Sequence, residues 1–245
     1  MISEKMKEYV KNGSAIRAMF EEGKQMAKEV GAENVYDFSL GNPNVAAPEA
    51  VKEAIVDLVT HEDPVNLHGY MSNSGYEDVR ETIASSLNKR FGTSFAGKNI
   101  VMTVGAAGGL NVILKTLLNA GDEVVVFAPF FGEYRFYVQN YDAILKVVPP
   151  NTKTFQPDLE AFEKILTPKT KAVIVNSPNN PTGVVYSEET IQKLSDLLRQ
   201  KQKVFGTDIY LISDEPYREL VYGDTEVPYL TKYYENTIVG YSYSK

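Results

Sequence analysis

Four polar side chains are the strongest candidates for chemistry, because each follows an apolar stretch of the chain. Lys245 follows the stretch 237–241, and its amine could act as a nucleophile if burial or a nearby cation lowered its pKa. Asp214 could be an acid–base group, a metal ligand or the partner of a cationic ring nitrogen. Asn180 and Tyr217 could hydrogen-bond an oxygen. The structural alternatives are a charged chain end, a helix N-cap, a turn asparagine and a core tyrosine.

A glycine-rich turn adds a candidate anion site. Gly105, Ala106 and Ala107 open a helical pattern, and backbone N–H groups at a helix N-terminus bind phosphate. The spacing is neither that of a dinucleotide-binding fingerprint nor that of a Walker A loop, and plain helix–strand packing is the alternative. Phe131, in the loop after residues 123–127, could stack on a planar ligand or pack in the core.

The candidate side chains need a scaffold that gathers them, and the apolar pattern supplies one. Strands are predicted at 100–104, 123–127, 143–148, 171–176, 209–213 and 237–241. Helices are predicted at 14–30, from Pro48 to about Val59, and at 77–91, 107–119, 130–140, 158–166, 188–203 and 216–221. Such alternation indicates an α/β fold, with a mostly parallel sheet covered by helices on both faces. Ligands bind at the carboxyl ends of such strands, where the candidates lie.

Composition excludes several classes of function. The 245 residues include no cysteine and two histidines, which rules out thiolate zinc sites, thiol nucleophiles and three-histidine metal sites. No metal site is expected. The net charge of −7 argues against nucleic acid as the main partner. No apolar run approaches the ~20 residues that span a bilayer, and the charged start is not a secretory signal. We therefore expect a cytoplasmic enzyme with no membrane partner.

Taken together, the candidates fit one cofactor. An amine, an acid for a pyridinium nitrogen, a phenol and an amide for a ring hydroxyl, a stacking ring and a phosphate cup are what pyridoxal 5'-phosphate requires. The chain resembles the class I/II aminotransferases, which are fold type I pyridoxal-phosphate enzymes. The motifs that carry this resemblance are LGNP at 40–43, GY at 69–70, NNPTG at 179–183, DEPY at 214–217 and SYSK at 242–245.

The resemblance implies a role for each candidate. Lys245 would form the internal aldimine and then carry the proton of the 1,3-shift. Asp214 would keep the pyridine nitrogen protonated, while Asn180 and Tyr217 would hydrogen-bond the phenolic oxygen. Other residues implied to bind the cofactor are Gly105, Ala106, Ala107 and Ser242 at the phosphate, Phe131 on the ring, and Tyr70 at the phosphate of a neighbouring subunit. Residues implied near the substrate are Gly41, Ile16 and Asn180.

The resemblance also implies a domain division and a dimer. Residues 1–47 would form an N-terminal arm and part of a smaller domain, and residues 48–245 the cofactor-binding large domain of a homodimer with shared active sites. The family continues beyond the cofactor lysine, so we expect that a C-terminal part, including the arginine for the substrate carboxylate, is missing from the sequence as written. An intact mass matching these residues alone would contradict that expectation.

Three functions stay open at this stage. The leading one is an aminotransferase acting on an α-amino acid and a 2-oxo acid. A carbon–sulfur lyase could use the same scaffold and motifs, and the motifs do not separate the two. A non-catalytic, aminotransferase-like ligand sensor is the alternative of another class, but such regulators carry a basic upstream domain that is not expected in this acidic chain. Which amino acid and which oxo acid are used is not encoded in these motifs.

Overall fold

The coordinates are a computed structural model that describes residues 1–11, 13, 15–39, 41 and 45–244. The chain separates into two compact units, Met1–Tyr70 and Met71–Lys245. The division at residue 47 predicted from the resemblance stays a prediction. Each unit is described by itself below.

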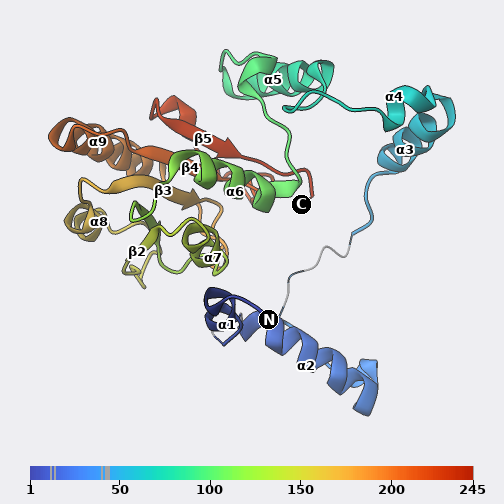
Figure 1. Cartoon of the computed structure of the whole chain (residues 1–245), viewed down its shortest axis with the longest axis horizontal. Helices are drawn as coiled ribbons and strands as arrows, with labels where there is room; N and C mark the ends of the chain where they lie inside the picture. Colours follow the sequence, from blue (N-terminus) through green and yellow to red (C-terminus); the bar gives the residue numbers. More distant parts are fainter. Residues whose placement is uncertain (12, 14, 40, 42–44, 245) are drawn as a thin grey trace. The chain divides into compact units, whose positions relative to one another are not determined.

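The first unit consists of helices joined by irregular segments (Figure 1). They are α1 (Glu4–Lys11), α2 (Ala15–Val30), the 3₁₀ turn η1 (Ala32–Asn34), α3 (Glu49–His61) and α4 (Pro64–His68). The sequence prediction missed α1 and α4. Both carry ordinary start signals: Ser3 Oγ accepts the Met6 N–H at 3.2 Å, and Asp63 Oδ1 accepts the Val65 N–H at 2.8 Å ahead of Pro64.

The second unit begins with α5 (Glu77–Phe91), which has the predicted bounds 77–91 and is followed by Gly92 in the left-handed region at φ 65°. The elements that follow are η2 (Gly97–Asn99), α6 (Gly105–Leu117), β1 (Glu123–Phe127), α7 (Tyr134–Gln139), β2 (Ile144–Val148), α8 (Leu159–Ile165), β3 (Thr170–Asn176), α9 (Glu188–Phe205), β4 (Tyr210–Asp214), η3 (Leu230–Lys232) and β5 (Thr237–Gly240). The order alternates strands and helices, as the apolar pattern predicts.

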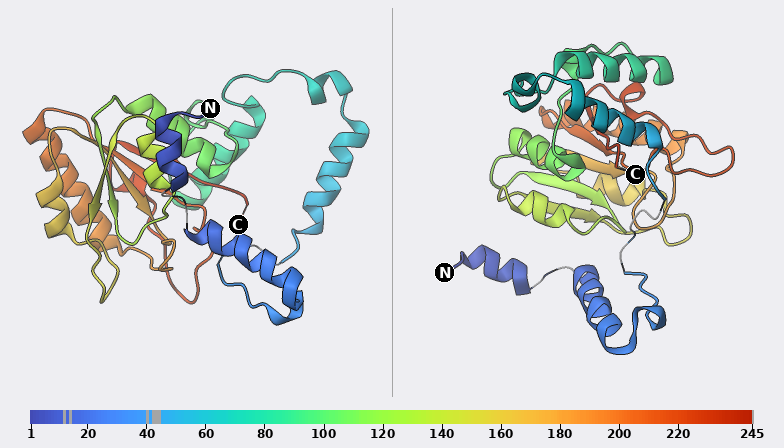
Figure 2. Two further views of the ribbon diagram at one scale, coloured as in Figure 1. Left: turned by 60° about the horizontal axis from the view of Figure 1, so that its bottom comes forward. Right: turned by 90° about the vertical axis from the view of Figure 1, so that its right-hand side faces the viewer.

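Among the described residues, five parallel strands form one sheet in the order β2-β1-β3-β4-β5. Alternate residues of the central strands face opposite layers. Val125 and Val173 join a core with α8 and α9, whereas Val124 and Ala172 join a core with α6 and α7. The left view of Figure 2 shows the strands between these two helix layers. The predicted α/β fold, with a parallel sheet covered on both faces, is therefore confirmed.

Two predicted elements are wrong. Residues 100–104 are rich in β-branched side chains but form no strand and pair with none of the described strands; the Met102 N–H instead donates to the Ser74 carbonyl at 3.0 Å. Residues 216–221 are not a helix. Pro216 lies in the first of two tight turns, in which the N–H groups of Arg218 and Leu220 donate to carbonyls three residues earlier.

None of the helices in the described part of the chain is long and apolar enough to cross a membrane.

Candidate active site

The carboxyl ends of the parallel strands form one edge of the sheet, and a cavity of about 280 Å³ lies there. Asn176 and Asp214, the last residues of β3 and β4, are partners in the register of the ladder. This places the two polar ends level with each other. The predicted site residues that line the cavity are Gly105, Ala106, Ala107, Phe131, Asn180, Asp214, Tyr217 and Ser242. The structure thus brings together residues that are more than a hundred positions apart.

Asp214 lies at the centre of this edge and is only 4% exposed. Its Oδ2 accepts a hydrogen bond from the Tyr134 hydroxyl, whereas its Oδ1 is buried with no hydrogen-bond partner in the described structure. Burial raises the pKa of Asp214 to about 6; the Tyr134 hydrogen bond opposes this shift and the Glu215 charge adds to it. Asp214 is therefore a buried carboxylate with one oxygen free to accept a donor from the cavity.

Asn176 ties the strand ends to the loop that carries Asn180. Its Nδ2 donates to the Asp214 carbonyl at 2.9 Å, and its Oδ1 accepts the Asn180 N–H at 2.7 Å. Within the loop, Asn179 Oδ1 accepts from the Thr182 N–H and hydroxyl at 3.1 and 2.8 Å. These bonds fix the backbone from which the Asn180 side chain projects.

Asn180 and Tyr217 meet at the cavity. The Asn180 amide donates to the Tyr217 hydroxyl at 3.4 Å, so the two groups lie close enough to share an oxygen atom of a ligand. The pKa of Tyr217 is raised, mainly by burial. Tyr217 is therefore a neutral phenol at physiological pH, and its hydroxyl proton can be donated to another acceptor.

The N-terminus of α6 opens onto the same cavity. Gly105 adopts φ 68°, a left-handed conformation that favours glycine, and its N–H donates to the Thr103 carbonyl at 3.0 Å. Val104, the preceding residue, supplies no side-chain cap. The first-turn N–H groups of the helix, including those of Ala106 and Ala107, therefore remain available to an anion.

Two further predicted residues complete the wall. The Phe131 ring packs edge-on against Tyr134, with ring centroids 5.6 Å apart. Ser242 and Ser244 share a hydrogen bond between their hydroxyls at 2.7 Å, and both line the cavity. Lys245 lies outside the described residues, but the residue before it reaches the cavity wall.

Three predicted residues are not placed with this group. Gly41 and Tyr70 are exposed residues of the other compact unit. Ile16 falls within α2, but its side chain lies outside the described part of the chain. Their predicted roles stay predictions.

The sequence prediction missed two residues of the site, Tyr134 and Asn176. Asn176 is the one polar residue that ends the apolar run 172–176, which is the same signal that marks Asp214. Tyr134 lies three residues after Phe131, so a single helical turn brings it beside that ring. Neither pattern reveals that both residues hold Asp214.

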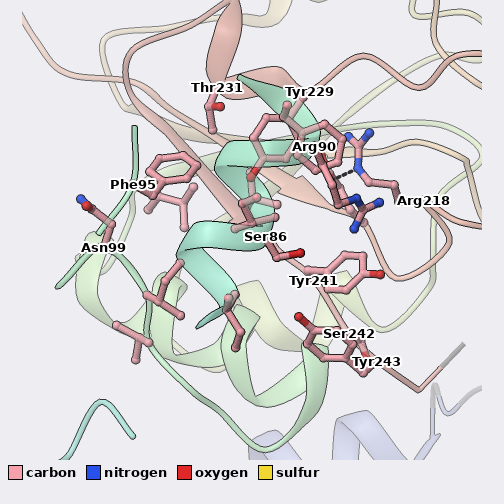
Figure 3. A pocket seen from close by; sticks show the side chains of 18 of the residues that line it. Ser86, Arg90, Phe95, Asn99, Arg218, Tyr229, Thr231, Tyr241, Ser242 and Tyr243 are labelled. Carbon is pink, nitrogen blue, oxygen red and sulfur yellow. Dashed lines mark hydrogen bonds and ion pairs between the residues drawn. The ribbon is translucent and has the colours of Figure 1, made fainter. Parts of the chain in front are cut away.

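A larger cavity, about 540 Å³, lies beside this site between α5 and β5 (Figure 3). Its charged groups are paired: Arg90 with Glu219 and Arg218 with Glu215, each at 2.5 Å. The rings of Phe91 and Tyr229 stack at 4.2 Å beside these pairs. Of the predicted site residues that the structure describes, only Gly105 and Ser242 line it, so most of the described candidates lie at the smaller cavity.

Comparison with known proteins agrees with this geometry. The family "Aminotransferase class I and II" matches residues 33–245. The chain is 36% identical to the aspartate aminotransferase of Thermotoga maritima over 193 residues, covering 78% of this chain and 48% of that protein. It is 33% identical over 203 residues to a probable aspartate/prephenate aminotransferase of Aquifex aeolicus, covering 82% and 49%.

Among solved structures, an aminotransferase of Eubacterium rectale superposes with a TM-score of 0.95 at 49% identity, over all of this chain and 62% of that one. The chain spans about half the length of the curated relatives it matches. The match covers the sheet, the loops at its carboxyl edge and the motifs that line the smaller cavity. The chain belongs to the class I and II aminotransferase family.

Proposed function

We propose that this chain carries the cofactor site of a pyridoxal-phosphate-dependent aminotransferase, which moves an amino group between an α-amino acid and a 2-oxo acid. The observation that carries the proposal is the free Oδ1 of the buried Asp214 in a cavity that is also lined by the N-terminus of α6. Family membership and relatives named as aminotransferases support the same reaction.

The residues fit the cofactor at its ring nitrogen. A buried carboxylate with an unpaired oxygen is costly, and a cationic N–H donor would satisfy it and favour its charged form. A protonated pyridine ring is such a donor. Asp214 would bind this end of the ring and hold its proton in place.

The residues also fit the phosphate. An anion at the N-terminus of α6 would accept the first-turn N–H groups of Ala106 and Ala107 and gain from the helix dipole. The Ser242 hydroxyl would add a donor from the loop after β5. Asn180 and Tyr217 would bind the ring oxygen, and Phe131 would cover one face of the ring and exclude water.

When bound, pyridoxal phosphate supplies an aldehyde that binds amines and a ring that stores an electron pair. The chain's own groups do the rest. Lys245 would bind the cofactor covalently in the resting state and, once free, would move the substrate proton. Asp214 would keep the ring nitrogen protonated throughout, because its ionised form lies in a site shielded from water.

The reaction class is tested by comparing two assays on the cofactor-loaded protein. Amino transfer is assayed with a panel of amino donors and with 2-oxoglutarate as the acceptor. Elimination is followed by release of pyruvate and ammonia from cystathionine. Transfer without elimination is expected. Elimination without transfer would assign the scaffold to a carbon–sulfur lyase, and neither activity, with cofactor bound, would favour a ligand-sensing protein. The panel also identifies the substrates. Aspartate is the first amino donor tested, and prephenate, which is a 2-oxo acid, is the first acceptor tested in place of 2-oxoglutarate, because relatives bear those names.

We further propose a homodimer in which Tyr70 of one subunit donates to the phosphate in the other. Tyr70 is fully exposed within its own unit, which leaves its hydroxyl for an outside acceptor. Tyr70→Phe is expected to weaken pyridoxal phosphate binding about 10- to 100-fold without unfolding the protein, because one hydrogen bond to a charged group is lost. Equilibrium dialysis of the cofactor measures this. Tyr36→Phe, at another exposed tyrosine of the same unit, is the control.

Mixing two variants tests whether the sites are shared, provided that the cofactor concentration is low enough for Tyr70→Ala alone to be inactive. Tyr70→Ala and Lys245→Ala subunits would place both lesions in one site of a heterodimer and leave the other intact. Activity is then expected to return on subunit exchange. No recovery, with exchange verified by native mass spectrometry, would show that Tyr70 does not act across the interface.

A further inference from the structure

Tyr134 makes a contact that the proposed reaction has not yet used. It is the first residue of α7, only 1% exposed, and its hydroxyl donates to Asp214 Oδ2. Tyr134 follows β1 in the chain, whereas Asp214 ends β4, and β3 lies between those two strands in the sheet. The hydrogen bond therefore spans the carboxyl edge of the sheet, and both residues line the cavity.

The bond determines how the Asp214 carboxylate is presented. The torsion of an aspartate carboxylate is broad and roughly two-fold, so burial alone does not fix it. The backbone of Asp214 is held by Asn176, but in the described structure the Tyr134 hydroxyl is the one donor to its carboxylate. With Oδ2 engaged in this way, Oδ1 is left as the free acceptor.

The proton lies on the tyrosine. Burial and the Asp214 charge raise the pKa of Tyr134 well above its ordinary value, whereas the pKa of Asp214 is about 6. Above that pH the pair is a neutral phenol donating to a carboxylate. The other titratable groups that influence it are Glu215, Tyr217 and Tyr137.

We propose that Tyr134 is a positioning residue, whose hydroxyl holds Oδ2 of Asp214 so that Oδ1 is presented to the cationic N–H donor of the cofactor. The identity of that donor rests on the proposed function. The hold on Asp214 does not, because it exists in the cofactor-free protein.

Tyr134→Phe in the cofactor-free full chain tests the hold directly. The Asp214 carboxyl is followed by ¹³C NMR of aspartate-labelled protein, with its signal assigned by its absence in Asp214→Asn. Removing a hydrogen bond to the charged form is expected to raise the pKa of Asp214 by about one to two units. Tyr234→Phe is the matched control, since Tyr234 is also 1% exposed and its hydroxyl donates at 2.7 Å to the Ile209 carbonyl.

An unchanged Asp214 titration in Tyr134→Phe, or an equal shift in Tyr234→Phe, would overturn the proposal. If Tyr134→Phe does not fold, the hydroxyl proton itself is observed in the wild-type protein at low temperature. A slowly exchanging tyrosine hydroxyl that disappears in Asp214→Ala supports the hold, and its absence in the wild type contradicts it.

The second measurement concerns the cofactor. Tyr134→Phe is expected to weaken pyridoxal phosphate binding about 2- to 10-fold at pH 7, as the raised pKa leaves less of Asp214 ionised, and less at pH 9, where Asp214 is ionised with or without the tyrosine. A loss that does not change with pH would show that Tyr134 only supports packing. A pKa shift of Asp214 without any pyridoxal phosphate binding by the wild type would leave the hold in place and refute the proposed function instead.

Discussion

Lys245→Ala is expected to abolish covalent retention of pyridoxal phosphate and amino transfer together. The amine is both the group that attaches the cofactor and the group that moves the substrate proton, so no other residue compensates for its loss. Borohydride reduction followed by intact mass spectrometry measures the attachment, and a single-turnover assay measures the transfer. Activity is expected to fall below detection while the fold is retained.

A lysine of the same unit serves as the control. Lys169 is exposed in the turn before β3, and Lys169→Ala is expected to retain attachment and turnover. If Lys245→Ala turns over normally and still gives the borohydride-reduced cofactor adduct in full yield, the nucleophile is elsewhere in the chain.

Asp214→Asn is the second variant with a large expected effect. The amide keeps the size of the side chain and an acceptor for Tyr134, but it carries no charge to keep a ring nitrogen protonated. Without that charge the transition state is less stabilised, so we expect kcat to fall about 10³-fold or more. Each tenfold loss corresponds to about 1.4 kcal/mol of transition-state stabilisation. Cofactor binding is expected to weaken less than kcat. Steady-state kinetics and dialysis give the two values.

Asp208→Asn is the matched control, since Asp208 is an exposed acid ahead of β4, at the opposite end of the same strand. It is expected to change kcat by no more than a few-fold. If Asp214→Asn behaves the same way, Asp214 caps the following turn rather than serving the cofactor.

The same carboxyl makes the stability of the cofactor-free protein depend on pH. Its pKa is raised from about 4 in the unfolded chain to about 6 in the folded one, so the folded protein binds this proton more tightly. The stabilisation is complete below pH 4 and is lost as the pH rises to about 6. Urea unfolding at a series of pH values should show this component in the wild type and its absence in Asp214→Asn. Equal pH profiles for the two proteins would contradict the raised pKa.

The sheet was predictable because its strands are buried on both faces. The segments at 123–127 and 171–176 are almost wholly apolar, which is the pattern of a parallel strand between two helix layers. Residues 100–104 have the same composition but form no strand, since a strand requires a neighbour as well as β-branched residues. The amino-acid composition of a segment shows whether it has β-branched residues, but it does not show whether a neighbouring strand is present.

The candidate site residues were predictable where a sequence motif lies just after a predicted strand. Asp214, Asn180 and Tyr217 each lie just after a predicted strand, and the sheet edge brings them together. Tyr134 was not predictable in this way, because its role depends on a hydrogen bond to a residue eighty positions later and two strands away. The position of Lys245 relative to the cavity remains a prediction.

The hydrogen bonds of Asn176 also affect how the site opens. The Asn180 N–H belongs to a loop, yet its acceptor is a side chain only 5% exposed at the end of a central strand. For this amide to exchange its hydrogen with solvent, its bond to the Asn176 side chain must break. Its exchange rate therefore measures how often the loop separates from the end of β3. A single loop amide thus reports the local opening of the edge on which the candidate cofactor residues lie.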